Sequence, residues 1–137
     1  MTEPERAHCS VAARWLAAEV GALSALGLGA AGALVAWALL RPQPPVWSWL
    51  VLALLPIERV LALRLSFDAG LFEDLGSGRL TLAGLDAALA TLGLRRAPAV
   101  SRPLAERIAG ARALAWRHVG VVAAQVAILS LAWSRST

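Results

Sequence analysis

A few polar side chains stand inside long apolar runs, and these are the residues with which the chain could do chemistry. Glu19 is the charge within the first run, and Glu58 and Arg59 stand together in the second. Ionisable residues inside a membrane are costly and commonly mark ion pathways or proton relays. Gln125, midway along the last run, could hydrogen-bond between helices. We therefore expect an intramembrane polar site made of Glu19, Glu58, Arg59 and Gln125.

The adjacent Glu58 and Arg59 have two interpretations. If the second helix enters the membrane near Pro45, the two residues lie about 20 Å along it, inside the hydrocarbon region. Alternatively, the helix sits shallow and the pair marks the inner interface, with the Arg59 side chain reaching out to water. Because sequence neighbours do not face each other on a helix, we expect each residue to need its own partner.

Glu19 lies about one turn into the first run and also has two interpretations. It could carry a proton or bind a cation within the membrane. It could instead be an interfacial carboxylate that pairs with a nearby arginine, such as Arg14 or Arg117.

Small residues recur every four positions along the first run. Gly21, Ala25, Gly29 and Ala33 fall on one helix face. Small residues at this spacing let helix backbones approach closely, which predicts a helix-packing interface. The pattern is compatible both with packing inside the chain and with association with another subunit.

The basic residues are thirteen arginines and no lysine. Six of them lie before the last apolar run or in its first turn, and these could contact anionic lipid head groups or a phosphorylated lipid carrier. Alternatively, they are the positive charge that keeps this segment in the cytoplasm. The six are Arg95, Arg96, Arg102, Arg107, Arg112 and Arg117.

Common catalytic motifs do not occur in the sequence. There is no phosphate-binding loop, nucleophile elbow, zinc-protease motif or cysteine pair at ligand spacing, so we expect no cofactor and no metal and favour a non-enzymatic role. Cys9 is the single cysteine, and with His8 it is expected to lie in a mobile N-terminal tail. The net charge of +4 does not indicate nucleic acid, because the arginines flank apolar runs.

Three long apolar runs must position these residues. Hydrophobic residues make up 58% of the 137, charged residues make up 16%, and the mean hydropathy is +0.64. Runs at about 15–40, 46–63 and 114–133 are long enough to cross a hydrocarbon core of roughly 30 Å. The sequence predicts an all-α integral membrane protein with three transmembrane helices in a single membrane-embedded domain. The second span is the least secure, because Glu58 and Arg59 interrupt it.

The sequence predicts that residues 64–113 form a small cytoplasmic helical cap, where the second and third spans extend beyond the membrane. Apolar residues at helical spacing form three stripes that can bury one another. The stripes are Leu63, Phe67, Leu71 and Leu75; Leu82, Leu85 and Leu89; and Leu104, Ile108, Ala111 and Ala115.

The arginine distribution predicts the orientation. Nine of the thirteen lie between Arg59 and Arg117, which places the middle segment in the cytoplasm of a bacterial-type inner membrane. Three spans then put the N-terminus inside and the C-terminus outside. Tryptophan prefers the two interfaces and agrees with this arrangement. Trp15 and Trp116 fall at the inner interface, and Trp37, Trp47, Trp49 and Trp133 at the outer one.

These features favour an accessory or scaffolding protein of the inner membrane. It would bind membrane lipids, associate with another membrane protein or with itself through the small-residue face, and offer its cap to a partner. The alternative is a small transporter, or a protein that handles anionic lipids, using the intramembrane Glu and Arg residues. A lipid-modifying enzyme is a third alternative.

Overall fold

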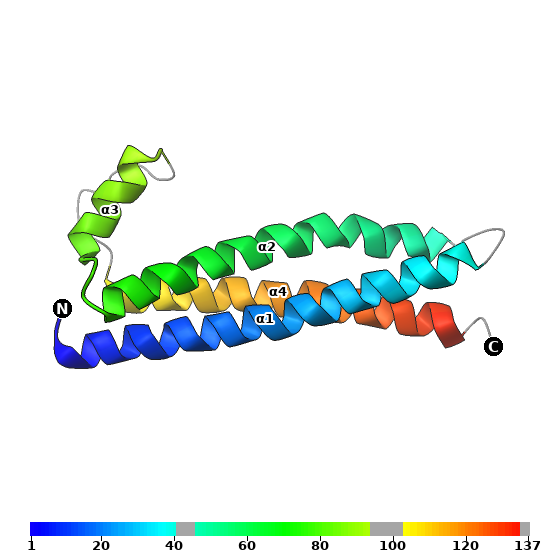
Figure 1. The fold of residues 1–137 in the computed structure, drawn as a ribbon, viewed down its shortest axis with the longest axis horizontal. Coiled ribbons are helices and arrows are strands. Elements are labelled where there is room, and N and C mark those ends of the chain that lie inside the picture. The colour runs from blue at the N-terminus through cyan, green and yellow to red at the C-terminus, as the bar shows by residue number, and fades with distance from the viewer. Residues whose placement is uncertain (41–45, 94–102, 135–137) are drawn as a thin grey trace.

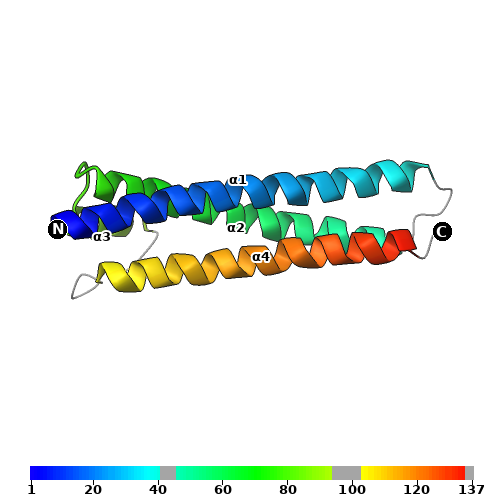
Figure 2. The same ribbon diagram turned by 90° about the horizontal axis from the view of Figure 1, so that it is seen from below.

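The structure is a computed structural model that describes residues 1–40, 46–93 and 103–134. These residues form four helices and no strand: α1 (Glu3–Leu39), α2 (Val46–Gly76), α3 (Leu82–Thr91) and α4 (Leu104–Ser134). The three long helices lie side by side in an elongated bundle, with α2 antiparallel to α1 and α4 (Figure 1 and Figure 2). The short α3 projects from the end that holds the N-terminus. The all-α expectation is confirmed.

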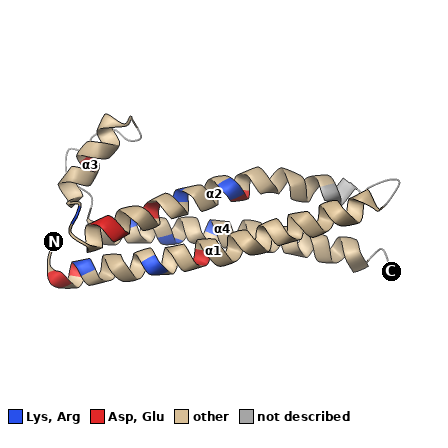
Figure 3. Cartoon of the chain, in the orientation of Figure 1, with Lys and Arg blue, Asp and Glu red and all other residues tan. Residues whose placement is uncertain are grey.

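Charge divides the bundle into two halves along its axis. One half holds the N-terminus, α3 and most of the charged side chains, and the other half is almost entirely uncharged (Figure 3). The uncharged half consists of residues 20–39, 46–57 and 119–134. Both α1 and α4 are long and apolar enough to cross a membrane.

α1 begins twelve residues before the predicted start of the first span. The Thr2 backbone N–H donates to Glu5 Oε2 at 2.7 Å, which holds the first turn. Cys9 is completely buried. The prediction of a mobile tail around His8 and Cys9 is therefore wrong, because Cys9, Ala13 and Leu16 continue one helix face into the core.

The charged half has a hydrophobic core to which all four helices contribute. The predicted stripe on α2 is confirmed for Leu75, which is buried, and for Leu71, which packs against this core. It is wrong for Leu63, which is 72% exposed, and for Phe67, which is 48% exposed. Residues spaced by four drift around a helix, whereas the buried face follows the 3.5-residue period of helices packed in a bundle. The core also includes α1, so the predicted cap is not confined to residues 64–113. Its members are Cys9, Ala13, Leu16, Leu65, Ala69, Phe72, Leu75, Leu85, Leu104, Ala111 and Ala115.

Gly76 marks a close approach of α2 to α1 in the charged half. A methyl group on Gly76 would lie 3.1 Å from Ser10 N and 3.2 Å from Arg6 O, and neither backbone atom can move easily. We expect Gly76→Ala to lower the free energy of unfolding by about 1–3 kcal/mol. Gly70→Ala is the matched control on the same helix, because its methyl group would meet open space. Denaturant titration in detergent, followed by circular dichroism, should separate the two variants, and equal midpoints would contradict the packing.

A nearly buried ion pair ties α3 to α4. Arg107 Nη2 lies 2.6 Å from Asp86 Oδ1, and each side chain is only 10% exposed. We expect Arg107→Ala to weaken the attachment of α3 by about 2 kcal/mol, because it leaves the Asp86 carboxylate without this cation. Arg112→Ala removes an exposed arginine of the same helix and should have no such effect. Hydrogen exchange of the α3 amides measures the difference, and unchanged exchange in Arg107→Ala would rule out this role.

Candidate functional site

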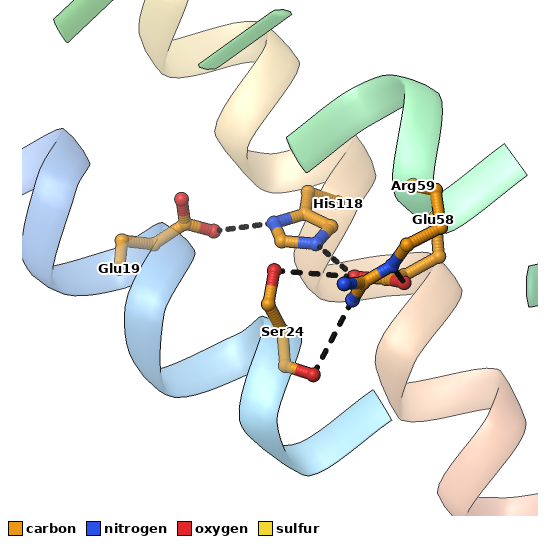
Figure 4. Close-up of polar contacts among 5 residues, drawn as sticks. All are labelled: Glu19, Ser24, Glu58, Arg59 and His118. Carbon is orange, nitrogen blue, oxygen red and sulfur yellow. Dashed lines mark hydrogen bonds and ion pairs between the residues drawn. The ribbon is translucent and has the colours of Figure 1, made fainter. Parts of the chain in front are cut away.

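Near the boundary between the two halves, the three long helices bring polar side chains together in the bundle interior. Glu58 of α2, with His118 and Gln125 of α4, has no exposed surface. Glu19 and Ser24 of α1 face Glu58 and His118 across the helix interfaces (Figure 4). Each long helix therefore contributes to one buried polar cluster.

His118 connects carboxylates from the two other long helices. Its Nδ1 lies 3.3 Å from Glu19 Oε1, and its Nε2 lies 3.0 Å from Glu58 Oε1 (Figure 4). A neutral imidazole has one N–H and can donate to only one of these acceptors. Both contacts are hydrogen bonds only if these three side chains together hold one more proton, either on the imidazole or on a carboxyl group. Glu19, His118 and Glu58 thus form a chain, here called the carboxylate–histidine chain, in which a proton has alternative positions.

Arg59 neutralises Glu58 from the adjacent position in the sequence. Arg59 Nε donates to Glu58 Oε2 and Arg59 Nη2 donates to Glu58 Oε1, both at 2.5 Å. Arg59 Nη2 also donates to the Ser24 carbonyl at 3.3 Å, and the Ser24 hydroxyl lies 3.4 Å from Glu58 Oε1. The prediction that Glu58 and Arg59 each need a separate partner is therefore wrong, because the long Arg59 side chain folds back onto its neighbour.

The Glu58–Arg59 pair determines how charge is distributed in the cluster. Its two charges cancel, and the bidentate contact favours the ionised form of Glu58. One proton shared between Glu19 and His118 then leaves the whole cluster neutral. Because uncompensated charge is expensive in an apolar interior, this neutral arrangement is the favoured one.

Gly27 lets α1 approach the cluster closely. A methyl group at this position would lie 3.2 Å from Gln125 Oε1 and 3.4 Å from Glu58 Cδ. Within the described part of the chain, neither amide atom of Gln125 has a hydrogen-bond partner, and Glu19 Oε2 also lacks one. The predicted interhelical hydrogen bond from Gln125 is therefore not formed to any described residue.

The structure changes the predicted partner of Glu19. Arg14 and Arg117 are exposed, and the ion-pair partner of Glu19 is His118. The sequence reasoning missed His118, Ser24 and Gly27 as parts of the site. The sequence does contain a signal for His118. One face of α4 is buried, its residues recur at helical spacing, and the two polar residues His118 and Gln125 lie on it. That face is Ala111, Ala115, His118, Val122 and Gln125.

The four small residues predicted as a packing interface all lie on the exposed face of α1. A methyl group on Gly21 or Gly29 would meet nothing within 4 Å. Packing inside the bundle instead uses Gly27, Ala30 and Ala31. Association with another subunit remains a prediction for the outer face, which consists of Gly21, Ala25, Gly29 and Ala33.

The six predicted lipid-contacting arginines have different surroundings. Arg107 is paired with Asp86, whereas Arg112 and Arg117 are exposed. The other three, Arg95, Arg96 and Arg102, lie outside the described residues. Lipid contact therefore remains a prediction for the exposed arginines.

Neither a metal centre nor a ligand cavity competes with this cluster as a candidate site. Within residues 1–40, 46–93 and 103–134, no three His, Cys, Asp or Glu side chains are placed to hold a metal ion. A shallow hollow lies between α1 and α4, lined by Ala33, Leu129, Ser130 and Trp133, and none of these residues belongs to the polar cluster. Comparisons with protein families, curated proteins and solved structures found no match for this chain. The polar cluster is therefore the candidate functional site.

Proposed function

We propose that this chain is a small proton-binding membrane protein of the transport class, with three membrane-spanning helices. Its carboxylate–histidine chain would carry a proton between the inner membrane surface and the middle of the membrane. The observation that carries this proposal is the buried His118 ring with a different carboxylate at each nitrogen. Chains of Asp, Glu and His inside membranes are the usual components of proton relays.

The length of the uncharged half supports the membrane placement. Residues 20–39 of α1 carry no charge and span about 30 Å, which matches a hydrocarbon core. α2 lies alongside α1 and α4 through this region, so a membrane crossed by both of them would also contain α2. Trp15 and Trp116 are exposed and flank Glu19 and His118 in sequence, as expected at an inner interface.

The proposed orientation places the N-terminus in the cytoplasm and the C-terminus outside a bacterial-type inner membrane. It is supported by the arginines of the charged half. Single cysteines introduced as Arg96→Cys and Ser136→Cys, in a Cys9→Ser background, should react with an impermeant thiol reagent from opposite sides. Reaction of both from one side would exclude three spans.

The cluster reaches only partway across this membrane. Glu58 lies twelve residues from the start of α2, about 18 Å along the helix, and Gln125 lies nine residues, about 14 Å, from the end of α4. Glu19 lies next to the inner end of the uncharged stretch. Beyond Gln125, the interior face of α4 is apolar. A proton would therefore enter from the inner side and stop near the middle, as expected for coupling to a conformational change rather than for an open proton channel.

Proton binding gives the direct test. We expect His118→Gln to change proton uptake by the protein, because glutamine keeps hydrogen-bonding capacity but cannot take up a proton. Potentiometric titration of protein in lipid nanodiscs measures this uptake. Nitrogen-15 spectra of the wild-type His118 ring should change in Glu19→Gln and in Glu58→Gln.

His8→Gln is the matched control for the nitrogen spectra, because it removes the other histidine, which is exposed and lies outside the cluster, and should leave the His118 signals unchanged. Equal proton uptake by His118→Gln and the wild type, or His118 nitrogen signals that do not respond to Glu19→Gln, would disprove the proposal. Circular dichroism of each variant establishes that the helices are retained.

A second candidate function, an accessory or scaffolding subunit, is favoured by a different observation. The small-residue face of α1 points outward from the bundle in the uncharged half, where another membrane protein or a second copy could pack. Under this proposal, Gly29→Leu would abolish co-purification of a partner in mild detergent and leave the carboxylate–histidine chain intact. A wild-type monomer that purifies without a partner would count against it.

A further inference from the structure

The Arg59 guanidinium has hydrogen-bond donors that the bundle does not use. An arginine side chain carries five N–H groups. Nε donates to Glu58, and Nη2 donates to Glu58 and to the Ser24 carbonyl, which uses three of the five. Among the described residues, the two N–H groups of Nη1 have no partner, and the Arg59 side chain is 38% exposed. Arg59 therefore presents a cation with spare donors at the surface of the bundle.

The exposed side of Arg59 lies below the inner membrane surface. The uncharged stretch of α1 starts after Glu19, and Ser24, which accepts from Arg59, lies five residues further, about 7 Å into the stretch. In the membrane placement proposed above, this side of the guanidinium faces lipid and not bulk water. Unsatisfied donors on a cation are costly at this depth, so they favour an anion that can reach it. The phosphate groups of inner-leaflet phospholipids are the nearest such anions.

The face of α1 beside Ser24 leaves room for such a group. Gly21 lies three residues before Ser24 and is exposed, and a methyl group on Gly21 would meet nothing within 4 Å. Arg14 is also exposed and lies seven residues before Gly21, which places the two on one face of the helix. A lipid on this face would therefore meet Arg14 on the cytoplasmic side and Arg59 deeper in the membrane.

We propose that Arg59 binds the phosphate of an anionic inner-leaflet phospholipid beside Gly21, with Arg14 near the head group. The Nη1 N–H groups can donate to phosphate oxygens, which guanidinium groups bind strongly. Basic side chains between membrane helices on the cytoplasmic side are typical contacts of anionic head groups. The site rests on the membrane placement in the proposed function, and it does not require His118 to bind a proton.

Lipid binding at Arg59 would be coupled to the carboxylate–histidine chain through charge. The single positive charge of Arg59 is balanced by the Glu58 carboxylate. A phosphodiester adds one negative charge that shares the same guanidinium, so one proton taken up from water restores neutrality. The carboxylates of Glu19 and Glu58 can accept this proton. Because coupling between two sites is reciprocal, lipid binding and proton uptake should strengthen each other.

All three long helices contribute groups to this coupling. The polar and charged side chains that face one another are Glu19 and Ser24 of α1, Glu58 and Arg59 of α2, and His118 and Gln125 of α4.

Dipolar coupling between nitrogen-15 and phosphorus-31 tests the contact directly. In nanodiscs that contain phosphatidylglycerol, the side-chain nitrogen signals of Arg59 should be dephased by phosphorus. Gly21→Leu should abolish this effect, because it covers the open face and leaves the Glu58–Arg59 pair intact. Gly32→Leu is the matched control, since it places leucine in open space eleven residues further along α1, and the coupling should remain. Absence of the coupling in the wild type would overturn the site.

Native mass spectrometry of lipid-titrated protein measures the affinity. We expect Gly21→Leu and Arg59→Gln to lower the affinity for phosphatidylglycerol by at least about tenfold. Arg64→Gln removes an exposed arginine from another side of α2 and should leave the affinity unchanged. Soluble glycerol phosphate, which has no acyl chains, should not bind at the same concentrations. Equal binding of glycerol phosphate, or a wild-type dimer that excludes lipid, would overturn the lipid assignment.

Proton uptake separates the coupling from the binding site. In phosphatidylglycerol nanodiscs, the wild type should take up more protons than Gly21→Leu, whereas in phosphatidylcholine nanodiscs the two should be equal. Comparison within one membrane cancels the effect of surface charge on local pH. Equal uptake in both membranes, together with normal lipid binding, would overturn only the coupling. Equal proton uptake by His118→Gln and the wild type would instead overturn the proposed function.

Discussion

Replacement of Glu58 by leucine is expected to lower the free energy of unfolding by about 2–3 kcal/mol. Leucine leaves Arg59 without its bidentate carboxylate in the middle of the bundle, and it leaves His118 Nε2 without its acceptor. The Arg59 side chain is 38% exposed and keeps its contact with the Ser24 carbonyl, so the loss comes from the charge-assisted hydrogen bonds and from the acceptor of His118. The loss should therefore be much larger than that of a typical surface substitution.

The double variant Glu58→Leu/Arg59→Leu identifies the cause of this loss. Removal of both charges leaves a hydrophobic helix face, so we expect the double variant to recover most of the stability while still failing to bind the proton at His118 normally. Denaturant titration in detergent measures the stability, and potentiometric titration measures the proton. A double variant as unstable as Glu58→Leu would mean that the loss comes from packing around Glu58 and not from the stranded cation.

Leucine substitutions at two glycines of α1 should have effects of very different size. Gly27→Leu forces a side chain into the interface occupied by Gln125 and Glu58, and we expect it to lower the free energy of unfolding by about 3 kcal/mol and to disrupt proton binding. Gly29→Leu places the same side chain on the exposed face, so stability should change by less than about 0.5 kcal/mol. The two positions are only two residues apart, which makes the pair a strict test of how α1 is rotated in the bundle.

The same pair also distinguishes the two candidate functions. Loss of partner co-purification in Gly29→Leu with normal proton binding would support the accessory role, whereas normal behaviour of Gly29→Leu throughout would leave the polar cluster as the functional element. Size-exclusion chromatography with light scattering, together with the proton titration, gives both readouts. Equal destabilisation by Gly27→Leu and Gly29→Leu would contradict the placement of Gly27 at the helix interface.

The sequence predicted where the helices lie along the chain better than it predicted how each helix is rotated about its own axis. Long apolar runs and glycine or proline boundaries were sufficient to locate α2 and α4, because helix formation depends on local composition. Which face is buried depends on two neighbouring helices at once. This is why Leu63 and Phe67 were assigned to the core although Leu65 and Phe72 occupy it. For the same reason, the sequence left open whether the small residues of α1 pack inside the chain or against another subunit, and in the structure they lie on the exposed face.

For the polar cluster, the sequence indicated several members but not their contacts. Glu19, Glu58 and Gln125 stood out because polar residues are rare in apolar runs. His118 is ninety-nine residues from Glu19 and sixty from Glu58, so nothing local connects them. The Arg59 contact was missed because the spacing rule describes where side chains begin on a helix, and a long side chain can return to its neighbour.

The pairing of Arg59 with its own neighbour has a consequence for biosynthesis. If α2 enters the membrane after α1, it brings a compensating charge with it, and the Ser24 carbonyl of α1 is already present to receive the guanidinium. A hairpin of the first two helices could therefore be inserted as an electrically balanced unit. His118 arrives only with α4, which follows α1 and α2 in the chain, and adds the contact between Glu58 and Glu19. Synthesis of α4 would then be the step that turns an inserted hairpin into a protein able to bind its proton, and a chain stopped before α4 would be inserted but inactive.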